Sequence, residues 1–228
     1  MSELYLCGAG NPEGVRLAVK VNQQQNRWDR ISLLDDDESK HEKSVLGVEI
    51  AGPFSSLEQA DKGTAEAVNL VARTTSGRAS ALRKVKEYGV PRTTLIHPDV
   101  DTLGVGTGDA VTVYQNVTLG AESSVADGSV VFIGTVVGHG SCMGGNCVVA
   151  PNAVINARVQ IEDNVYIGAN ATVLPEIRIG AGATVSAGSV VMRDVPAGAT
   201  VMGVPAEVIF EGADSTPNTT DEHVDLEV

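Results

Sequence analysis

The residue best placed for acid–base chemistry is His139, the one histidine of four that lies in the regular part of this 228-residue sequence. Gly138 and Gly140 flank it, so we expect the ring to sit at an exposed corner. An unperturbed imidazole changes charge near neutral pH and can accept a proton from an attacking amine or hydroxyl. The pattern favours His139 as a general base, with an exposed corner residue as the alternative. A structural or solvent role is expected for the other three, which are His41, His97 and His223.

A glycine-rich turn near the N-terminus is the second place where chemistry is expected. It follows the apolar run Leu4–Cys7 and precedes a helix-like stretch from Gly14 to Gln25. Glycines at such a turn let the backbone approach a phosphate at a helix N-terminus. Two acids end the next apolar run, Arg30–Leu34, where a carboxylate can bind ribose or a base. The predicted substrate-binding residues are Gly8, Gly10, Asn11, Asp35 and Asp36; a purely structural turn is the competing interpretation.

The elements around this turn alternate between strand and helix. Further apolar runs at Val48–Ala51 and Ala67–Ala72, and a helix-like stretch from Gly77 to Tyr88, continue the pattern. Strand, glycine turn, helix, strand and acid are typical of a parallel α/β unit. Residues 1–93 are therefore predicted to form a small Rossmann-like α/β domain.

From about His97 onward a six-residue period replaces the helical one. Every sixth residue from Val113 to Val191 is apolar, and the residue two places earlier is small or β-branched. Two inward residues per hexad predict short strands and a triangular coil of about 18 residues, hence a parallel β-helix over residues 94–210. An antiparallel sandwich does not keep such a register. Corner glycines with positive φ are expected after the large residues, at Gly120, Gly138, Gly144, Gly168 and Gly180.

Composition narrows the partners. The formal charge of −13 argues against a nucleic-acid partner, which needs clustered Lys and Arg. Three cysteines, without metal-ligand spacing, are expected to be reduced thiols in a cytoplasmic protein. No apolar run is long enough to predict a membrane span, and no metal is expected. Residues 211–228 are acidic and polar and are predicted to be a disordered tail.

Several motifs resemble known acyltransferases. The segments Ser186–Val191, Arg193–Pro196 and Val201–Ala206 look like the closing motif of hexapeptide-repeat acyltransferases. Those at Leu33–Lys40, Val45–Val48 and Thr94–Pro98 are similar to the sugar acyltransferases among them. The chain thus resembles, over residues 3–209, the sialic acid O-acetyltransferases and the UDP-4-amino-sugar N-acetyltransferases of bacillosamine type.

This resemblance implies a left-handed β-helix, acetyl-CoA as acyl donor, and a homotrimer that shares its sites between subunits. Acetyl transfer to a sugar or nucleotide sugar would be direct, in a ternary complex, with His139 as base. The family's CoA contacts fall on Gly168, Ala169, Ala187 and Ala206. Arg193 would either reach a CoA phosphate or be a solvated surface arginine.

Three departures weaken the match at the chemistry. Gly140 stands where the family often has Glu or Asp, Val148 where a second histidine contacts the acyl-CoA, and Arg73 where glycine is usual. A catalytically weak or inactive nucleotide-sugar-binding scaffold is therefore the alternative. The γ-type carbonic anhydrases share the fold but need three converging histidines, and the repeat holds one.

Overall fold

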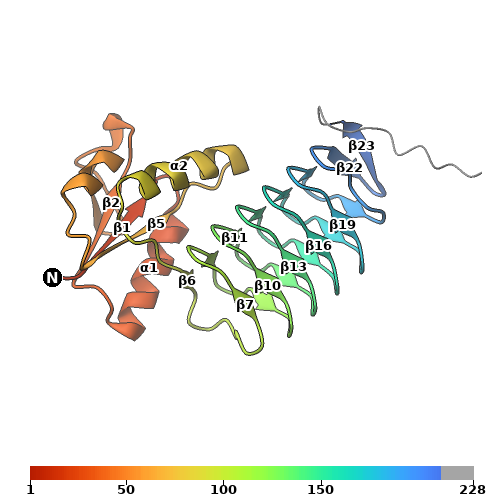
Figure 1. The fold of residues 1–228 in the computed structure, drawn as a ribbon, viewed down its shortest axis with the longest axis horizontal. Helices are drawn as coiled ribbons and strands as arrows, with labels where there is room; N and C mark the ends of the chain where they lie inside the picture. The colour runs from red at the N-terminus through yellow and green to blue at the C-terminus, as the bar shows by residue number, and fades with distance from the viewer. Residues whose placement is uncertain (212–228) are drawn as a thin grey trace, which may run out of the picture.

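The computed structural model describes residues 1–211 and shows an elongated molecule (Figure 1). An α/β unit forms one end, and a β-helix extends from it to a closing hairpin at the other. The predicted disordered tail lies, from residue 212 onward, outside the described residues.

The N-terminal unit is a five-stranded sheet with two helices. Its strands lie in the order β3-β4-β2-β1-β5, and all are parallel except β3, which forms an antiparallel hairpin with β4. The predicted strands and helices are present, with ends shifted by up to three residues. Their bounds are β1 Glu3–Cys7, α1 Pro12–Gln25, β2 Arg30–Leu34, β3 Ser44–Val45, β4 Val48–Gly52, β5 Ala65–Asn69 and α2 Thr75–Glu87, with short 3₁₀ turns η1 Glu38–Lys40 and η2 Phe54–Gln59.

Local sequence explains where the helices begin and end. The side chain of Asn11 accepts from the Gly14 N–H, and Pro12 opens α1 where no N–H is needed. The hydroxyl of Thr74 caps α2 in the same way, through the Gly77 N–H. Helix α1 ends at Asn26, which adopts the left-handed conformation.

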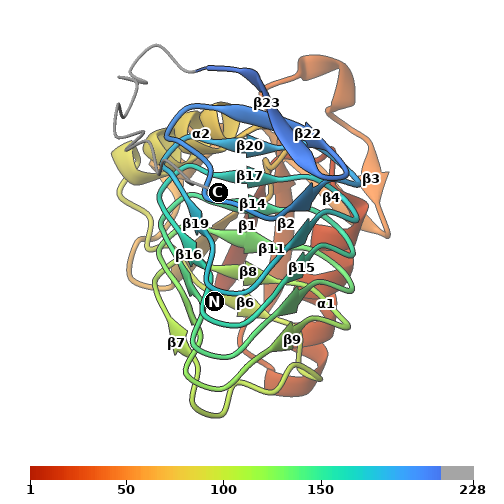
Figure 2. The same ribbon diagram turned by 90° about the vertical axis from the view of Figure 1, so that its right-hand side faces the viewer.

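The rest of the described chain is a three-faced β-helix, seen end-on in Figure 2. Face I contains β7 Gly106–Thr107, β10 Ser124–Val125, β13 Cys142–Met143, β16 Gln160–Ile161 and β19 Arg178–Ile179. Face II contains β6 Leu95–Ile96, β8 Thr112–Val113, β11 Val130–Val131, β14 Val148–Val149, β17 Tyr166–Ile167, β20 Thr184–Val185, β22 Thr200–Gly203 and β23 Ala206–Phe210. Face III contains β9 Thr118–Leu119, β12 Val136–Val137, β15 Val154–Ile155, β18 Thr172–Val173 and β21 Val190–Val191.

The six-residue register predicted from the sequence is present in the structure. From β7 to β21 each strand pairs in parallel with a strand 18 residues away, as Val131 does with Val149. All fourteen large positions from Val113 to Val191 are buried, none more than 7% exposed. Thirteen of the fourteen small positions are buried as well, and Ile177 is partly exposed. The interior is thus a continuous stack of aliphatic side chains along the prism axis.

The reason given above for the repeated glycines was wrong. Gly168 does not have a positive φ; a Cβ there would lie 2.4 Å from the backbone nitrogen of Ala187 in the next coil. The glycines at 120, 138, 144 and 180 meet the next coil's backbone in the same way. Positive φ falls two residues later and recurs every six residues, at Gly104, Ala110, Asn116, Glu122, Gly128, Gly134, Gly140, Asn146, Asn152, Arg158, Asn164, Asn170, Glu176, Gly182 and Gly188. The glycines permit close stacking, and other residue types accept the left-handed corner.

The α/β unit is tied to the start of the prism at two edges. Helix α2 lies along the edge between faces I and II, where Arg78 donates to the Gly128 carbonyl at 2.6 Å. Asn146 donates to the Thr75 carbonyl on the same edge. Near the edge between faces II and III, Asn11 donates to the Tyr114 hydroxyl at 2.7 Å. Apolar side chains of β1, α1 and face II form one shared core, so the two parts pack as a unit.

The far end of the prism is closed by an antiparallel hairpin of β22 and β23. Strand β22 pairs in parallel with β20, which leaves β23 as the outer strand. Figure 1 shows this hairpin at the end of the prism opposite the α/β unit.

Candidate functional site

A cavity of about 670 Å³ lies between the α/β unit and the prism. Four of the five predicted substrate residues line it, with Lys40, Arg73 and Phe132 beside them: Gly8, Gly10, Asn11 and Asp35. Asp36 lines a second cavity of about 300 Å³ with Lys84 and Phe54. Sequence reasoning thus found the glycine turn and Asp35 in the wall of the first cavity but missed Lys40 on the N-terminal side and Phe132 on the prism.

Asp35 holds the glycine turn in place. Its Oδ2 accepts from the Ala9 N–H at 2.8 Å and from the Lys40 ammonium at 3.0 Å, while Oδ1 accepts from the Asp37 N–H. Burial opposes ionisation of Asp35, but these donors outweigh it and hold its pKa below the ordinary value. Asp35 is therefore a carboxylate whose first task is to shape the turn.

Asp36 and Asn11 also have internal partners. Asp36 is partly desolvated, yet the Lys84 ammonium at 2.7 Å and the Phe54 N–H lower its pKa. Asn11 both caps α1 and reaches Tyr114, so its amide joins the turn to the prism. Of the two glycines, Gly8 is required, since it has φ +111° and a Cβ there would lie 2.9 Å from Val71; Gly10 has open space around it.

The prism supplies an aromatic wall to the cavity. The rings of Tyr114 and Phe132 stack with centroids 4.8 Å apart and planes 8° from parallel. Tyr114 is buried, which raises its pKa to about 12, whereas Phe132 is half-buried and lines the cavity. The two rings are 18 residues apart, so the repeat period would have placed them one above the other.

Three of the four residues predicted to contact CoA lie further along the edge between faces II and III of the prism. Gly168 and Ala169 connect β17 to β18, and Ala187 connects β20 to β21, so all three lie on the edge between faces II and III. Ala187 is exposed, and Gly168 lies directly against its backbone. Ala206 begins β23 at the far end of face II. The cavity wall at Phe132 is on this edge too, two coils before Gly168.

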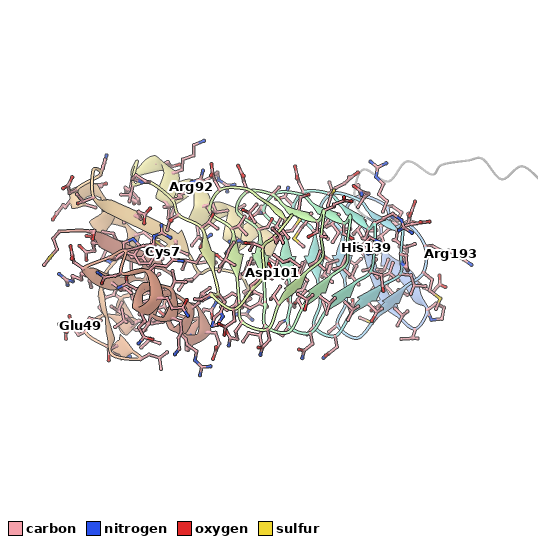
Figure 3. The ribbon with its side chains drawn as sticks, turned by 90° about the horizontal axis from the view of Figure 1, so that it is seen from below. Cys7, Glu49, Arg92, Asp101, His139 and Arg193 are labelled. Atoms are coloured by element: carbon pink, nitrogen blue, oxygen red, sulfur yellow. The ribbon has the colours of Figure 1, made fainter. Side chains whose placement is uncertain are left out.

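His139 lies on a different edge. It connects β12 on face III to β13 on face I and is exposed (Figure 3). Arg193 lies on that same edge, three coils further on. A single chain therefore does not bring His139 together with the predicted CoA contacts, because face III separates them.

The ring of His139 has a neighbour that sequence reasoning missed. Arg158, one coil on, has its Nη1 3.3 Å from the Nε2 of His139. Arg158 is itself paired with Glu176 of the following coil, through a contact of 2.6 Å. Spacings of 19 and 18 residues along the chain are the signal that could have revealed this column.

Val148 and Arg73, two of the departures from the family pattern, lie in different parts of the structure. Val148 is buried on face II, in the core shared with the α/β unit, so it does not line the predicted donor edge. Arg73 is exposed and lines the first cavity. In residues 1–211 no group of three or more His, Cys, Asp and Glu side chains is placed to hold a metal.

The cysteines and the helices can be compared with the predictions of free thiols and of no membrane span. Cys7, Cys142 and Cys147 are all free, as predicted. Burial raises the pKa of Cys7 and of Cys147 to about 12, and Cys142 is exposed. Among the described residues, no helix combines the length and the apolar character needed to cross a bilayer.

Comparison with known proteins identifies the repeat. Residues 158–193 match the family described as bacterial transferase hexapeptide (six repeats). Residues 158–193 thus carry the hexapeptide repeat of bacterial transferases. This match confirms the hexapeptide-repeat part of the resemblance drawn from the sequence.

Curated relatives agree over part of the chain. The acyl-[acyl-carrier-protein]–UDP-N-acetylglucosamine O-acyltransferase of Pseudomonas aeruginosa is 31% identical over 95 residues, which is 40% of this chain and 37% of that protein. The enzyme of the same name from Ectopseudomonas mendocina is 30% identical over 115 residues, 46% and 45% of the two chains. The chain thus spans less than half the length of these relatives.

Solved structures resemble the whole described chain. The acetyltransferase domain of PglB from Neisseria gonorrhoeae, in complex with acetyl coenzyme A, has a TM-score of 0.82 at 25% identity, over 91% of this chain and 98% of that one. A histidine-to-asparagine variant of perosamine N-acetyltransferase from Caulobacter crescentus, in complex with CoA and GDP-perosamine, gives 0.80 at 25% identity, over 92% and 98%. WeeI from Acinetobacter baumannii, 22% identical with a TM-score of 0.80 over 92% and 100%, shares the fold.

Proposed function

We propose that the protein transfers an acetyl group from acetyl-CoA to a sugar or nucleotide sugar, with His139 as the general base. The observation that supports this proposal is that the cavity and the residues predicted to contact CoA lie along the same edge of the prism. The cavity wall at Phe132 and the residues Gly168 and Ala187 lie along the edge between faces II and III. An acceptor in the cavity and a donor along the edge would meet end to end.

The catalytic base would come from a second copy of the chain. In a closed three-fold ring with face III turned to the axis, the His139 edge of one subunit meets the Phe132 edge of the next. The outward side chains of face III suit such packing because none is charged: Thr118, Val136, Val154, Thr172 and Val190. We therefore propose a homotrimer with three sites shared between subunits. Each site would be formed by two left-handed β-helices (residues 94–210) and one Rossmann-like domain (residues 1–93).

The chemistry follows from that placement. The acceptor nitrogen or oxygen attacks the thioester carbon, His139 takes the acceptor's proton, and the C–S bond breaks as the thiolate leaves. The proton can then pass from His139 to the departing sulfur, which balances the step without a covalent enzyme intermediate. Backbone N–H groups near Ala169 and Ala187 would bind the donor. Arg193, on the His139 edge, would reach a CoA phosphate from that side.

The acceptor is proposed to be a nucleotide sugar with a free amino group. Similarity to a perosamine N-acetyltransferase, solved with CoA and GDP-perosamine, supports an amine over a hydroxyl. Lys40 is paired with Asp35 in the cavity wall, and Arg73 adds a further positive charge there in a chain of net charge −13, which suits a diphosphate. A hydroxyl of a sialic-acid-like sugar is the second acceptor class. A cytoplasmic location, where both nucleotide sugars and acetyl-CoA are available, completes the proposal.

The test is an acetyl-CoA consumption assay with a panel of acceptors. CoA release is followed with a thiol reagent, in a Cys142→Ser background so that the exposed thiol adds no signal. UDP- and GDP-linked 4-amino sugars are compared with sialic acids, and mass spectrometry identifies the product. We expect turnover with an amino sugar and a loss of about 10²–10⁴-fold in His139→Ala. Absence of turnover with every acceptor would contradict the enzyme proposal.

One observation favours the alternative of an inactive nucleotide-sugar-binding scaffold. The His139 ring contacts an arginine rather than a carboxylate. Calorimetry that detects nucleotide-sugar binding without any acetyl transfer would support the scaffold and exclude the enzyme.

A further inference from the structure

The column on the edge between faces III and I has a fixed internal geometry. Arg158 uses its Nε and Nη2 to hold the Oε1 of Glu176, and this directs Nη1 to the opposite side, toward His139 Nε2 at 3.3 Å. The backbone repeats the connection, since the Arg158 N–H donates to the His139 carbonyl at 2.9 Å. A guanidinium is planar and rigid, so anchoring one side of it orients the other.

This contact determines which nitrogen of the ring carries the proton. A guanidinium donates hydrogen bonds and does not accept them. His139 Nε2 must therefore offer a lone pair to Arg158, and the neutral ring carries its hydrogen on Nδ1. In residues 1–211 no other side chain is hydrogen-bonded to this ring.

Gly140 makes room for the arrangement. A Cβ at this position would lie 3.3 Å from the Cγ of Arg158, closer than comfortable packing allows. The residue after His139 is thus small at the place where the Arg158 stem passes. A larger side chain there would compete with Arg158 for the same space.

We propose that Arg158 is a positioning residue that fixes His139 in the Nδ1–H tautomer, so that Nε2 is the nitrogen that accepts the acceptor's proton. The proposal rests on the function proposed above. The incoming amine replaces Arg158 at the Nε2 lone pair, while Glu176 retains the guanidinium close by. Once Nε2 is protonated it cannot accept from Arg158, so the contact and the protonated ring exclude each other.

Ring nitrogen NMR tests this without any need for activity. The chain is labelled with ¹⁵N-histidine, and the His139 signals are identified by their absence in His139→Ala. In the wild type at pH 8 we expect an unprotonated Nε2 and a protonated Nδ1. Arg158→Met should shift the population toward Nε2–H, and Glu176→Gln should do so less. A wild-type ring with its hydrogen on Nε2 would overturn the proposal.

The control removes a similar ion pair elsewhere. Arg178 pairs with Glu162 away from His139, so Arg178→Met should leave the His139 tautomer unchanged. A change of the same size in Arg178→Met would show that the response to Arg158→Met is unspecific, and would also overturn the proposal.

Kinetics separate positioning from substrate binding. Arg158→Met should lower kcat at least about tenfold while KM for acetyl-CoA stays within about twofold. A raised KM with unchanged kcat would instead make Arg158 a substrate ligand and contradict the positioning role. If the wild type turns over no acceptor, the enzyme proposal fails, and the tautomer measurement still decides the present one.

Discussion

At the scale of single residues, the structure separates two uses of glycine that the sequence presents alike. Gly180 lies against the backbone of Ala197, where a Cβ would be 2.5 Å from the nitrogen, whereas Gly188 has φ +70° and nothing near it. Only the first kind excludes every side chain, because the obstacle is the next coil's backbone.

The two glycines should therefore respond differently to asparagine. Gly188→Asn keeps a residue that tolerates the left-handed conformation and should cost well under 1 kcal/mol. Gly180→Asn forces neighbouring coils apart and should cost about 1–3 kcal/mol. Thermal or urea unfolding of the two variants measures the difference; equal losses would show that close stacking does not explain Gly180.

The thiols give a pH-dependent prediction. At pH 8 only Cys142 should react readily with a thiol reagent, since Cys7 and Cys147 are buried with pKa values raised to about 12. Because the pKa of Cys147 is 9.0 when unfolded and about 12 when folded, its contribution to stability is complete below pH 9 and is lost as the pH rises to 12. Cys147→Ser should flatten that alkaline fall, as followed by urea unfolding at pH 8 to 11. An unchanged slope of stability against pH in Cys147→Ser would contradict the raised pKa of Cys147.

At the scale of elements, Arg78 joins α2 to the prism. Its guanidinium is almost fully buried and donates to the carbonyls of Gly128, Asn69 and Val71, which belong to both parts of the molecule. Burial lowers its pKa to about 10, so it remains charged at neutral pH. Backbone carbonyls replace water around Nε and Nη1, whereas the buried Nη2 has no hydrogen-bond partner among residues 1–211.

Removal of this side chain should uncouple α2. Arg78→Met leaves buried carbonyls without donors and should cost about 2 kcal/mol or more. Hydrogen exchange should rise first in α2 and at the start of face II, while the later coils stay protected. The solvent-exposed Arg83→Met, on the same helix, is the control. Equal protection of α2 in both variants would show that Arg78 does not hold the junction.

The elements were largely predictable, and the site was predictable in part. The period of six reflects how the backbone repeats. The apolar series from Val113 to Val191 therefore predicted the prism without knowledge of any contact. Asp35 was predicted as a ligand, yet its oxygens first hold Ala9 and Lys40, and no local pattern distinguishes the two uses. Phe132 and Arg158 were missed because they act across coils. Spacings of 18 and 19 residues, about one coil of the prism, would place Phe132 beside Tyr114 and Arg158 beside His139.

At the scale of the whole molecule, the proposal that sites are shared between subunits is best tested by complementation. His139→Ala removes the proposed base, and Ala187→Trp obstructs the proposed donor edge of the chain that carries it, where Ala187 is exposed. Each variant alone should be inactive, and gel filtration with light scattering should give three times 23.6 kDa for both.

Co-expression of the two variants in equal amounts should restore about a quarter of wild-type activity, because a quarter of the interfaces pair an intact His139 with an intact edge. Sites contained within one chain would give no restoration, and that result would contradict the trimeric arrangement.

The β-helix also sets the distance between residues that lie on the same edge. From Phe132 to Gly168 the edge climbs two coils, and each coil advances by one strand spacing, about 4.8 Å. The distance between the proposed acceptor wall at Phe132 and the proposed donor contact at Gly168 is thus a whole number of coils and cannot vary continuously. A chain with one more 18-residue coil inserted between them would suit a substrate about 5 Å longer, and no intermediate length can be reached without breaking the register.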